Sequence, residues 1–279
     1  MASLLFMRFP GGRAKTVTFS YDDGVKQDKR FMEIMDKHGL KATFNINAGL
    51  FKKDEGVQGT DRMTVEKSVE AYANSGHEVA IHGLTHPFLE QLPTARATYE
   101  IIEDRRRLEE LFGHTIRGMA YPFGTTNDNV VEILKNAGIV YARTVVKTGK
   151  FDIPTDWLRL PATAKHTDPN LMDLAEQFLN DPKIGARAPQ MFYLWGHTHE
   201  FDKDDNWDVI EKFAETIGGK EDIWYATNIE IFDYITAYKQ LRFTVNMDLV
   251  ENPTATDLYF SWEGKDYVVK AGESLKLDR

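Results

Sequence analysis

Carboxylate and imidazole side chains follow two of the short apolar segments in this sequence. Two adjacent aspartates, Asp22 and Asp23, come after the first segment, and His82 and His86 come after a later one. One carboxylate and two imidazoles form a facial ligand set for a divalent metal, with open positions for water and substrate. The four-residue spacing lets both rings reach one ion if the segment makes a helical turn. Such a site has what metal-assisted hydrolysis requires.

The two aspartates can hold separate roles, because adjacent residues at a strand end point in different directions. One can bind the metal while the other handles a proton, although Asp-Asp-Gly taken alone is more often a turn that caps a helix. A later apolar segment ends in His197 and His199. His197 is a candidate proton donor, and either histidine can instead complete a metal site with four ligands.

The elements that must position these residues alternate along the chain, which predicts repeated βα units and a parallel sheet. The predicted strands are 15–19, 42–46, 78–81, 116–121, 140–144, 191–195 and 223–226. The predicted helices are 26–38, 64–74, 94–112, 127–137, 171–179, 207–217 and 230–239. This succession favours a closed or nearly closed barrel over a flat sheet. In a barrel, chemistry gathers at the carboxyl ends of the strands.

The last part of the chain follows a different pattern. After about residue 241 the helical periodicity stops, and the segments 243–247, 257–262 and 267–270 alternate like strands around turns. We therefore predict two parts: a barrel over residues 1–241 and a small β appendage over residues 242–279.

Composition excludes several classes of site and partner. The chain has no cysteine, so disulfides, thiolate metal sites and cysteine nucleophiles are excluded. A formal charge of −9 argues against nucleic acid as a partner. No apolar run approaches the roughly 20 residues of a membrane span, and the amino terminus does not resemble a secretion signal. We expect a cytoplasmic protein, or a secreted one if a signal was removed, and leave its oligomeric state open.

Five motifs occur in an order that resembles the polysaccharide deacetylase family, also called carbohydrate esterase family 4. They are Asp-Asp-Gly after an apolar strand, His-x-x-x-His after another, Tyr-Pro-Phe-Gly, Asp-Trp, and a late strand that ends in histidine. The resemblance spans roughly residues 16–199. One such motif is a weak signal, whereas five in the correct order are a specific one.

The resemblance implies a fold and a set of roles. The fold is a distorted (β/α)7-type barrel, here with the small β appendage at its carboxyl end. Asp23, His82 and His86 would bind a divalent metal, most often zinc. Asp22 would be the catalytic base and His197 the general acid.

The resemblance also implies residues that bind substrate. Tyr121 and Phe123 belong to a motif that lines one wall of the family's groove, where the backbone amide at Phe123 helps to hold the oxyanion. Asp156 matches a carboxylate that tunes the acid histidine, and Trp157 matches an indole that forms another wall. Trp195 stands where leucine is common and would narrow the pocket for the acetyl methyl group.

Two further positions depart from the family's pattern. Many members have an arginine at the position of Ala120, where it positions the catalytic base. Either Arg117 replaces it from nearby, or Asp22 is held in another way. Gly83 stands where serine or threonine is common, which removes a hydroxyl that would brace the loop of the second histidine.

The function expected from this resemblance is metal-dependent removal of N-acetyl groups from an amino-sugar oligosaccharide or polysaccharide. Two alternatives stay open. One is a metal-dependent hydrolase of a small linear or cyclic amide, and the other is a carbohydrate-binding protein that has lost catalysis. The presence of both aspartates and of all three motif histidines argues against the second alternative.

Overall fold

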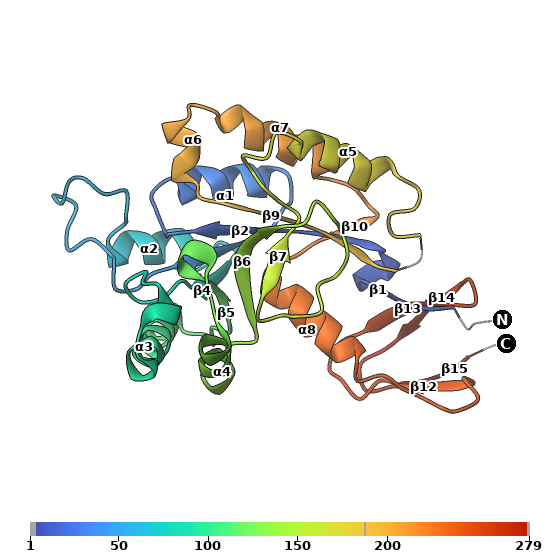
Figure 1. The fold of residues 1–279 in the computed structure, drawn as a ribbon. Coiled ribbons are helices and arrows are strands. Elements are labelled where there is room, and N and C mark those ends of the chain that lie inside the picture. Colours follow the sequence, from blue (N-terminus) through green and yellow to red (C-terminus); the bar gives the residue numbers. More distant parts are fainter. Residues whose placement is uncertain (1–3, 187, 278–279) are drawn as a thin grey trace.

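A parallel sheet forms the centre of the molecule. The computed structural model describes residues 4–186 and 188–277, which are coloured along the chain in Figure 1. The strand order is β7-β6-β5-β4-β3-β2-β9-β8, and β10 pairs with β2, all in parallel. The strands are β2 (Lys15–Asp22), β3 (Ala42–Ile46), β4 (Glu78–Ile81), β5 (Gly118–Ala120), β6 (Tyr141–Lys147), β7 (Leu160–Ala162), β8 (Ala164–Lys165), β9 (Gln190–Gly196) and β10 (Ile223–Tyr225).

The two ends of this sheet meet, which makes it a distorted barrel. β7 and β8 stand at opposite ends of the strand order, yet only Thr163 separates them in the chain. The amide of Thr163 donates to the carbonyl of Tyr193 in β9, at 2.9 Å. The α/β fold with a parallel, barrel-like sheet is thus confirmed. Strands β7 and β8 were not predicted, because segments of three and two residues are too short to show a period.

Helices surround the barrel-like sheet. Figure 1 shows α1, α5, α6 and α7 above it and α3, α4 and α8 below it. The helices are α1 (Asp28–Lys37), α2 (Val65–Tyr72), α3 (Thr94–Phe112), α4 (Asp128–Asn136), α5 (Leu171–Asn180), α6 (His199–Lys203), α7 (Trp207–Ile217) and α8 (Asn228–Tyr238), with 3-10 turns η1 (Pro10–Gly12), η2 (Leu89–Gln91) and η3 (Pro122–Gly124). All except α6 and the short turns match the predicted helices within two residues at each end.

Buried rings fill the space between the sheet and α1. All eight residues of β2 are buried, as expected of a parallel strand covered on both faces. Phe31 of α1 is fully buried and lies against the rings of Phe19, Tyr21 and Phe44. This cluster fixes the position of α1 behind the carboxyl end of β2.

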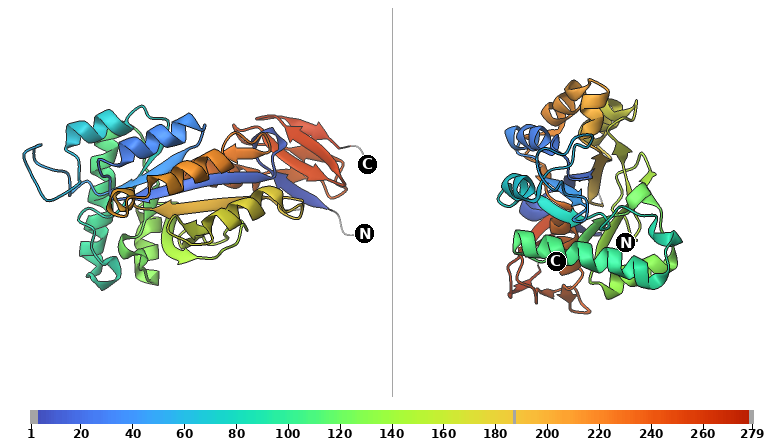
Figure 2. Two further views of the ribbon diagram at one scale, coloured as in Figure 1. Left: turned by 90° about the horizontal axis from the view of Figure 1, so that it is seen from above. Right: turned by 90° about the vertical axis from the view of Figure 1, so that its left-hand side faces the viewer.

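The appendage consists, within the described residues, of two three-stranded antiparallel sheets. One is β1-β13-β14 and the other β11-β12-β15, from β1 (Leu5–Arg8), β11 (Arg242–Phe243), β12 (Leu249–Glu251), β13 (Leu258–Trp262), β14 (Lys265–Val269) and β15 (Ser274–Lys276). Strand β1 thus pairs with the tail, and the division at residue 241 stays a prediction. Because β1 and η1 lead directly into β2, the appendage adjoins the amino end of β2, as Figure 2 shows.

None of the helices in the described residues combines the length and the hydropathy needed to cross a membrane.

Replacing Phe31 tests the aromatic cluster. We expect Phe31→Ala to lower the free energy of unfolding by about 3–5 kcal/mol, because the substitution removes a fully buried ring and leaves a cavity. Urea unfolding measures the change. Ile102→Ala on α3, where the side chain is 43% exposed, is the matched control, expected to stay within about 0.5 kcal/mol. Equal losses for the two variants would contradict this account of the core.

Candidate metal centre and catalytic site

One pocket gathers most of the predicted site residues at the carboxyl ends of the strands. The cavity measures about 660 Å³. Its lining includes the residues predicted for the metal, the base, the acid and part of the substrate groove: Asp22, Asp23, His82, His86, Tyr121, Phe123, Trp195 and His197. Strands β2, β4, β5 and β9 thus deliver their motifs to one place, as expected of a barrel.

Three of these residues form a group that can hold a metal ion. One ligand atom from each of Asp23, His82 and His86 lies within 4.8 Å of the others. Nδ1 of His82 donates to the carbonyl of Ala120 at 2.7 Å, which leaves the Nε2 lone pair for an ion. Among the described residues, the group includes neither His197 nor His199. This geometry favours three protein ligands over four.

The charge states of this group suit a divalent cation. Burial is the main cause that lowers the pKa of His82 to about 4, and it also lowers the pKa of His86. Burial tends to raise the pKa of Asp23, but Arg62, His82 and His197 together outweigh it, and the net shift is downward. Nη2 of Arg62 donates to Oδ1 of Asp23 at 2.7 Å. Near neutral pH the group therefore offers two neutral imidazoles and one carboxylate, the donor set that zinc accepts.

His82 and His86 lie on a loop with left-handed residues, and not on the helical turn that their spacing suggested. Gly83 has a φ of 74° and His86 a φ of 57°, both left-handed. A side chain at Gly83 would also crowd Pro122, so a serine or threonine does not suit this backbone. Nδ2 of Asn47 donates to the carbonyls of His82 and Gly83, each at 2.6 Å. Asn47 thereby braces the loop without the missing hydroxyl.

Backbone strain is concentrated at this pocket. Six described residues other than glycine have a positive φ, and Asp23, His86 and Phe123 of the pocket are among them. Left-handed conformations of such residues cost free energy and persist where the surrounding structure enforces them. Phe123, with a φ of 58°, lies within η3, so its strained peptide unit is held at the rim of the pocket.

The arginine that holds Asp22 comes from an unexpected strand. Nη2 of Arg143 lies 2.5 Å from both carboxylate oxygens of Asp22, and its side chain is fully buried. Ala120 on β5 and Arg143 on β6 are register partners, so the guanidinium enters from the strand beside the expected one. Arg117 instead pairs with Asp233 near the surface. The proposed substitution by Arg117 is therefore wrong.

The surroundings of Asp22 keep it ionised. Burial acts to raise the pKa of Asp22, but Arg143 together with His82 and His197 lowers it to about 2. Nδ2 of Asn45 also donates to Oδ1 at 2.9 Å. At neutral pH, this side chain can only accept a proton.

His197 lies opposite Asp22. Its Nε2 is 3.9 Å from Oδ2 of Asp22, and its Nδ1 is 3.4 Å from Oε2 of Glu200. Burial lowers the pKa of His197, but Glu200 and then Asp22 outweigh it and raise the pKa above its ordinary value. A carboxylate that stays ionised and an imidazole that favours its proton thus face one cavity.

The Asp-Trp motif lies elsewhere. Asp156 is about half exposed and pairs with Arg159, three residues later. Trp157 packs edge-on against Phe232 of α8, at 5.2 Å between ring centres. Glu200, rather than Asp156, is the carboxylate beside His197. The prediction that Asp156 tunes His197 thus disagrees with this geometry, because the loop after β6 turns Asp156 toward solvent.

Aromatic side chains form the wall next to the metal group. Tyr121 is buried, and its hydroxyl donates to the carbonyl of Leu158 at 2.7 Å. Phe123 stacks on Phe88 with ring centres 3.8 Å apart, and the side chains are 48% and 39% exposed. Trp195 is largely buried beneath the guanidinium of Arg143. Phe88 was missed by the sequence analysis, because it belongs to no motif.

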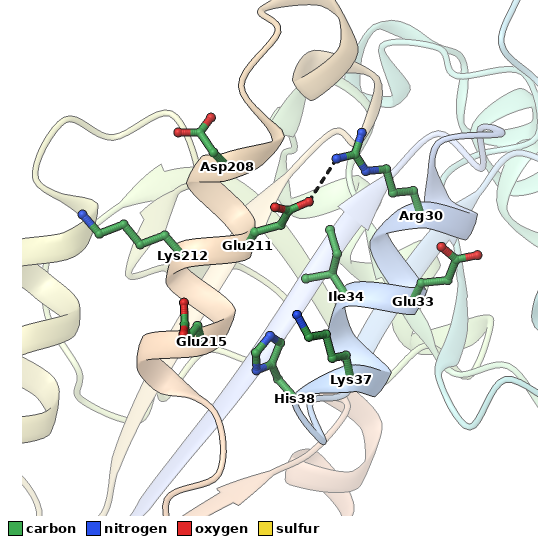
Figure 3. A pocket seen from close by; sticks show the side chains of 9 residues that line it. All are labelled: Arg30, Glu33, Ile34, Lys37, His38, Asp208, Glu211, Lys212 and Glu215. Atoms are coloured by element: carbon green, nitrogen blue, oxygen red, sulfur yellow. Dashed lines mark hydrogen bonds and ion pairs between the residues drawn. The ribbon is translucent and has the colours of Figure 1, made fainter.

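A second hollow lies between α1 and α7 and differs from this pocket. Figure 3 shows its side chains arranged along the facing surfaces of the two helices, where Arg30 pairs with Glu211. This hollow is a charged surface groove, because all of its lining residues except Ile34 and His38 carry a charged side chain.

Metal binding tests the ligand group. We expect added Zn²⁺ to raise the melting temperature of the protein, because a ligand bound only to the folded state stabilises it by about 2.7 kcal/mol at 100 times its Kd. EDTA should reverse the shift. His86→Asn should abolish it, whereas His114→Asn, at an exposed histidine outside the pocket, should retain it. An unchanged shift in His86→Asn would contradict the ligand assignment.

The buried ion pair predicts an unusual pattern of stability. Arg143→Met should cost about 3–5 kcal/mol, because it leaves the Asp22 carboxylate buried without its partner. The double variant Asp22→Asn with Arg143→Met should recover part of that loss. Arg117→Met, which breaks a more exposed pair, should cost at most about 1 kcal/mol. Denaturant unfolding of the three variants measures these differences, and a double variant no more stable than Arg143→Met would contradict the pairing.

Comparison with known proteins adds sequence evidence to this geometry. Residues 10–142 match the family described as Polysaccharide deacetylase. A chitooligosaccharide deacetylase of Sinorhizobium fredii is 27% identical over 152 residues, which make up 53% of this chain and 63% of that protein. The chain therefore spans less than two thirds of the length of this curated relative.

Solved structures show the same fold. A candidate polysaccharide deacetylase from Mycobacterium smegmatis has a TM-score of 0.61 at 16% identity, over 83% of this chain and 93% of that one. Puue allantoinase has a TM-score of 0.60 at 14% identity, over 80% and 90%. Identities this low establish the fold alone. The family match, with four of the five ordered motifs meeting in one pocket, shows that the chain belongs to the polysaccharide deacetylase family, carbohydrate esterase family 4.

Proposed function

We propose that this protein removes N-acetyl groups from an amino-sugar oligosaccharide or polysaccharide with the help of a bound zinc ion. One observation supports this most directly. The ligand group of Asp23, His82 and His86 shares a pocket with an ionised carboxylate at Asp22 and with His197, whose pKa is raised. Metal-assisted hydrolysis of an amide uses a bound cation, a base and an acid together.

The reaction needs a better electrophile and a better nucleophile than a free amide and water. A divalent ion held by the ligand group would polarise the acetyl carbonyl and lower the pKa of a water molecule from 15.7 to about 7. Asp22 takes the proton of that water as the oxygen attacks the carbonyl carbon. Arg143 keeps the carboxylate aimed at the pocket through its contacts with both oxygens.

The second half of the reaction belongs to His197. Its Nε2 faces the pocket and donates a proton to the amine nitrogen as the carbon–nitrogen bond breaks, with the bonding electrons passing to nitrogen. The products are acetate and the free amine. The backbone amide at Phe123, on the rim beside His86, is the candidate donor to the oxyanion.

The rim of the pocket supports a sugar substrate. Pyranose rings pack their apolar faces against exposed aromatic rings, and the stacked pair of Phe88 and Phe123 offers such a surface next to the metal group. The name of the Sinorhizobium relative points the same way, toward N-acetylated chitooligosaccharides. We therefore take these as the first substrates to test.

Acetate release from a panel of substrates tests the proposal. We expect the zinc-loaded protein to release acetate from N-acetylated chitooligosaccharides and to leave small cyclic and linear amides intact. Asp22→Asn should lower kcat by about 10²–10⁴-fold while the protein still binds zinc, because the variant keeps the ligands and loses the base. Activity on the small amides alone would favour a small-amide hydrolase. Tight binding of sugar without any acetate release would favour an inactive carbohydrate-binding protein.

A further inference from the structure

We propose that Glu200, braced by His166 and Lys165, is the positioning residue that orients His197 as the proton donor. This inference rests on the proposed function, in which His197 protonates the leaving amine. It assigns the tuning role to a carboxylate on α6, the short helix that begins directly after the histidine motif.

Glu200 stands between two imidazoles and a lysine. Its Oε2 lies 3.4 Å from Nδ1 of His197 and 3.1 Å from Nε2 of His166. Its Oε1 accepts a hydrogen bond from Nζ of Lys165 at 2.6 Å. The amide of Glu200 also donates to the carbonyl of His197 at 3.1 Å. Glu200 thus contacts His197 both through its backbone amide and through its carboxylate.

The backbone is shaped to admit His166. A Cβ atom at Gly196 would collide with Nδ1 of His166, so the imidazole reaches Glu200 only because residue 196 has no side chain. The ring of His166 stacks on Tyr21 at 5.7 Å and contacts Phe201 at 4.2 Å between ring centres. Its amide donates to the carbonyl of Trp195 at 3.0 Å. His166 is therefore a fixed part of this wall.

The charges in this wall favour a protonated His197. Burial acts to raise the pKa of Glu200, but His166, His197 and Lys165 outweigh it and hold the pKa far below its usual range. Burial lowers the pKa of His166, so this second imidazole tends to stay neutral. The carboxylate is then ionised and faces one imidazole that favours its proton.

The contact also selects which nitrogen of His197 acts. Glu200 approaches His197 on its Nδ1 side, at 3.4 Å, so the other nitrogen, Nε2, is the one that faces Asp22 and the pocket. Next in the chain, Thr198 is buried and donates to the buried carboxylate of Asp28, so the backbone that carries the ring is held as well. The ring is thereby fixed in the orientation that a general acid needs.

Two acetyl substrates separate this role from a structural one. Loss of an amine requires a proton from His197, whereas loss of 4-nitrophenolate from 4-nitrophenyl acetate does not. We expect Glu200→Gln to lower kcat on an N-acetylated chitooligosaccharide by about 10–100-fold and to change kcat on the ester by less than about 3-fold. His166→Asn, which keeps the carboxylate, should show a smaller loss with the same preference. If Glu200→Gln does not fold, His166→Asn provides the same comparison of the two substrates.

Glu211→Gln is the matched control. This glutamate pairs with an arginine in the surface groove of Figure 3 and should leave both activities unchanged. Equal losses on the two substrates, or a change confined to KM, would overturn the inference while the proposed function stands. A zinc-loaded wild type that releases acetate from neither substrate would instead overturn the proposed function, and this role with it.

Discussion

The ion pair between Asp22 and Arg143 is the interaction on which the pocket depends. Removing two charges from water costs several kcal/mol for each ion, and their attraction offsets this only when the geometry is good and the remaining polar atoms are paired. Both conditions hold here, because Arg143 contacts both oxygens of Asp22 and also donates to Ser20, while Asn45 donates to Asp22. The pair thus links β2, β3 and β6 beneath the metal group.

Two groups whose pKa values are shifted in opposite directions face each other in the pocket. The pKa of Asp22 is lowered to about 2, while the pKa of His197 is raised, although their closest atoms are only 3.9 Å apart. Separating the pKa values of neighbouring groups in this way assigns one as base and the other as acid. Arg143 favours the ionised form of Asp22, and Glu200 favours the protonated form of His197. Each of the two groups thus has its own charged partner.

Prediction from sequence succeeded where a pattern was long or local. Helices of eight to nineteen residues were located closely, because their periodicity extends over several turns, and seven strands of the parallel sheet were located as short apolar runs. The ligand motif was also local, since His82 and His86 lie on one loop. Helix α6 and the strands β1, β7, β8, β12 and β15 were missed, because segments of two to five residues do not establish a period of their own.

The partners of Asp22 and His197 could not be read from the sequence in the same way. Arg117 is closer in the chain to the family's arginine position, yet Arg143 occupies the site, because the register between β5 and β6 places it beside Ala120. Glu200, rather than Asp156, lies beside His197 for a similar reason, since a short helix turns it back onto the histidine.

By itself, the sequence determined the kinds of ligand and acid–base groups and the order in which a barrel would bring them together. The tertiary structure decided which arginine and which carboxylate serve them. The physical reason is that a charge acts through space: strands far apart in the chain can supply the same guanidinium or carboxylate to one cavity, and only strand register and loop direction select among them.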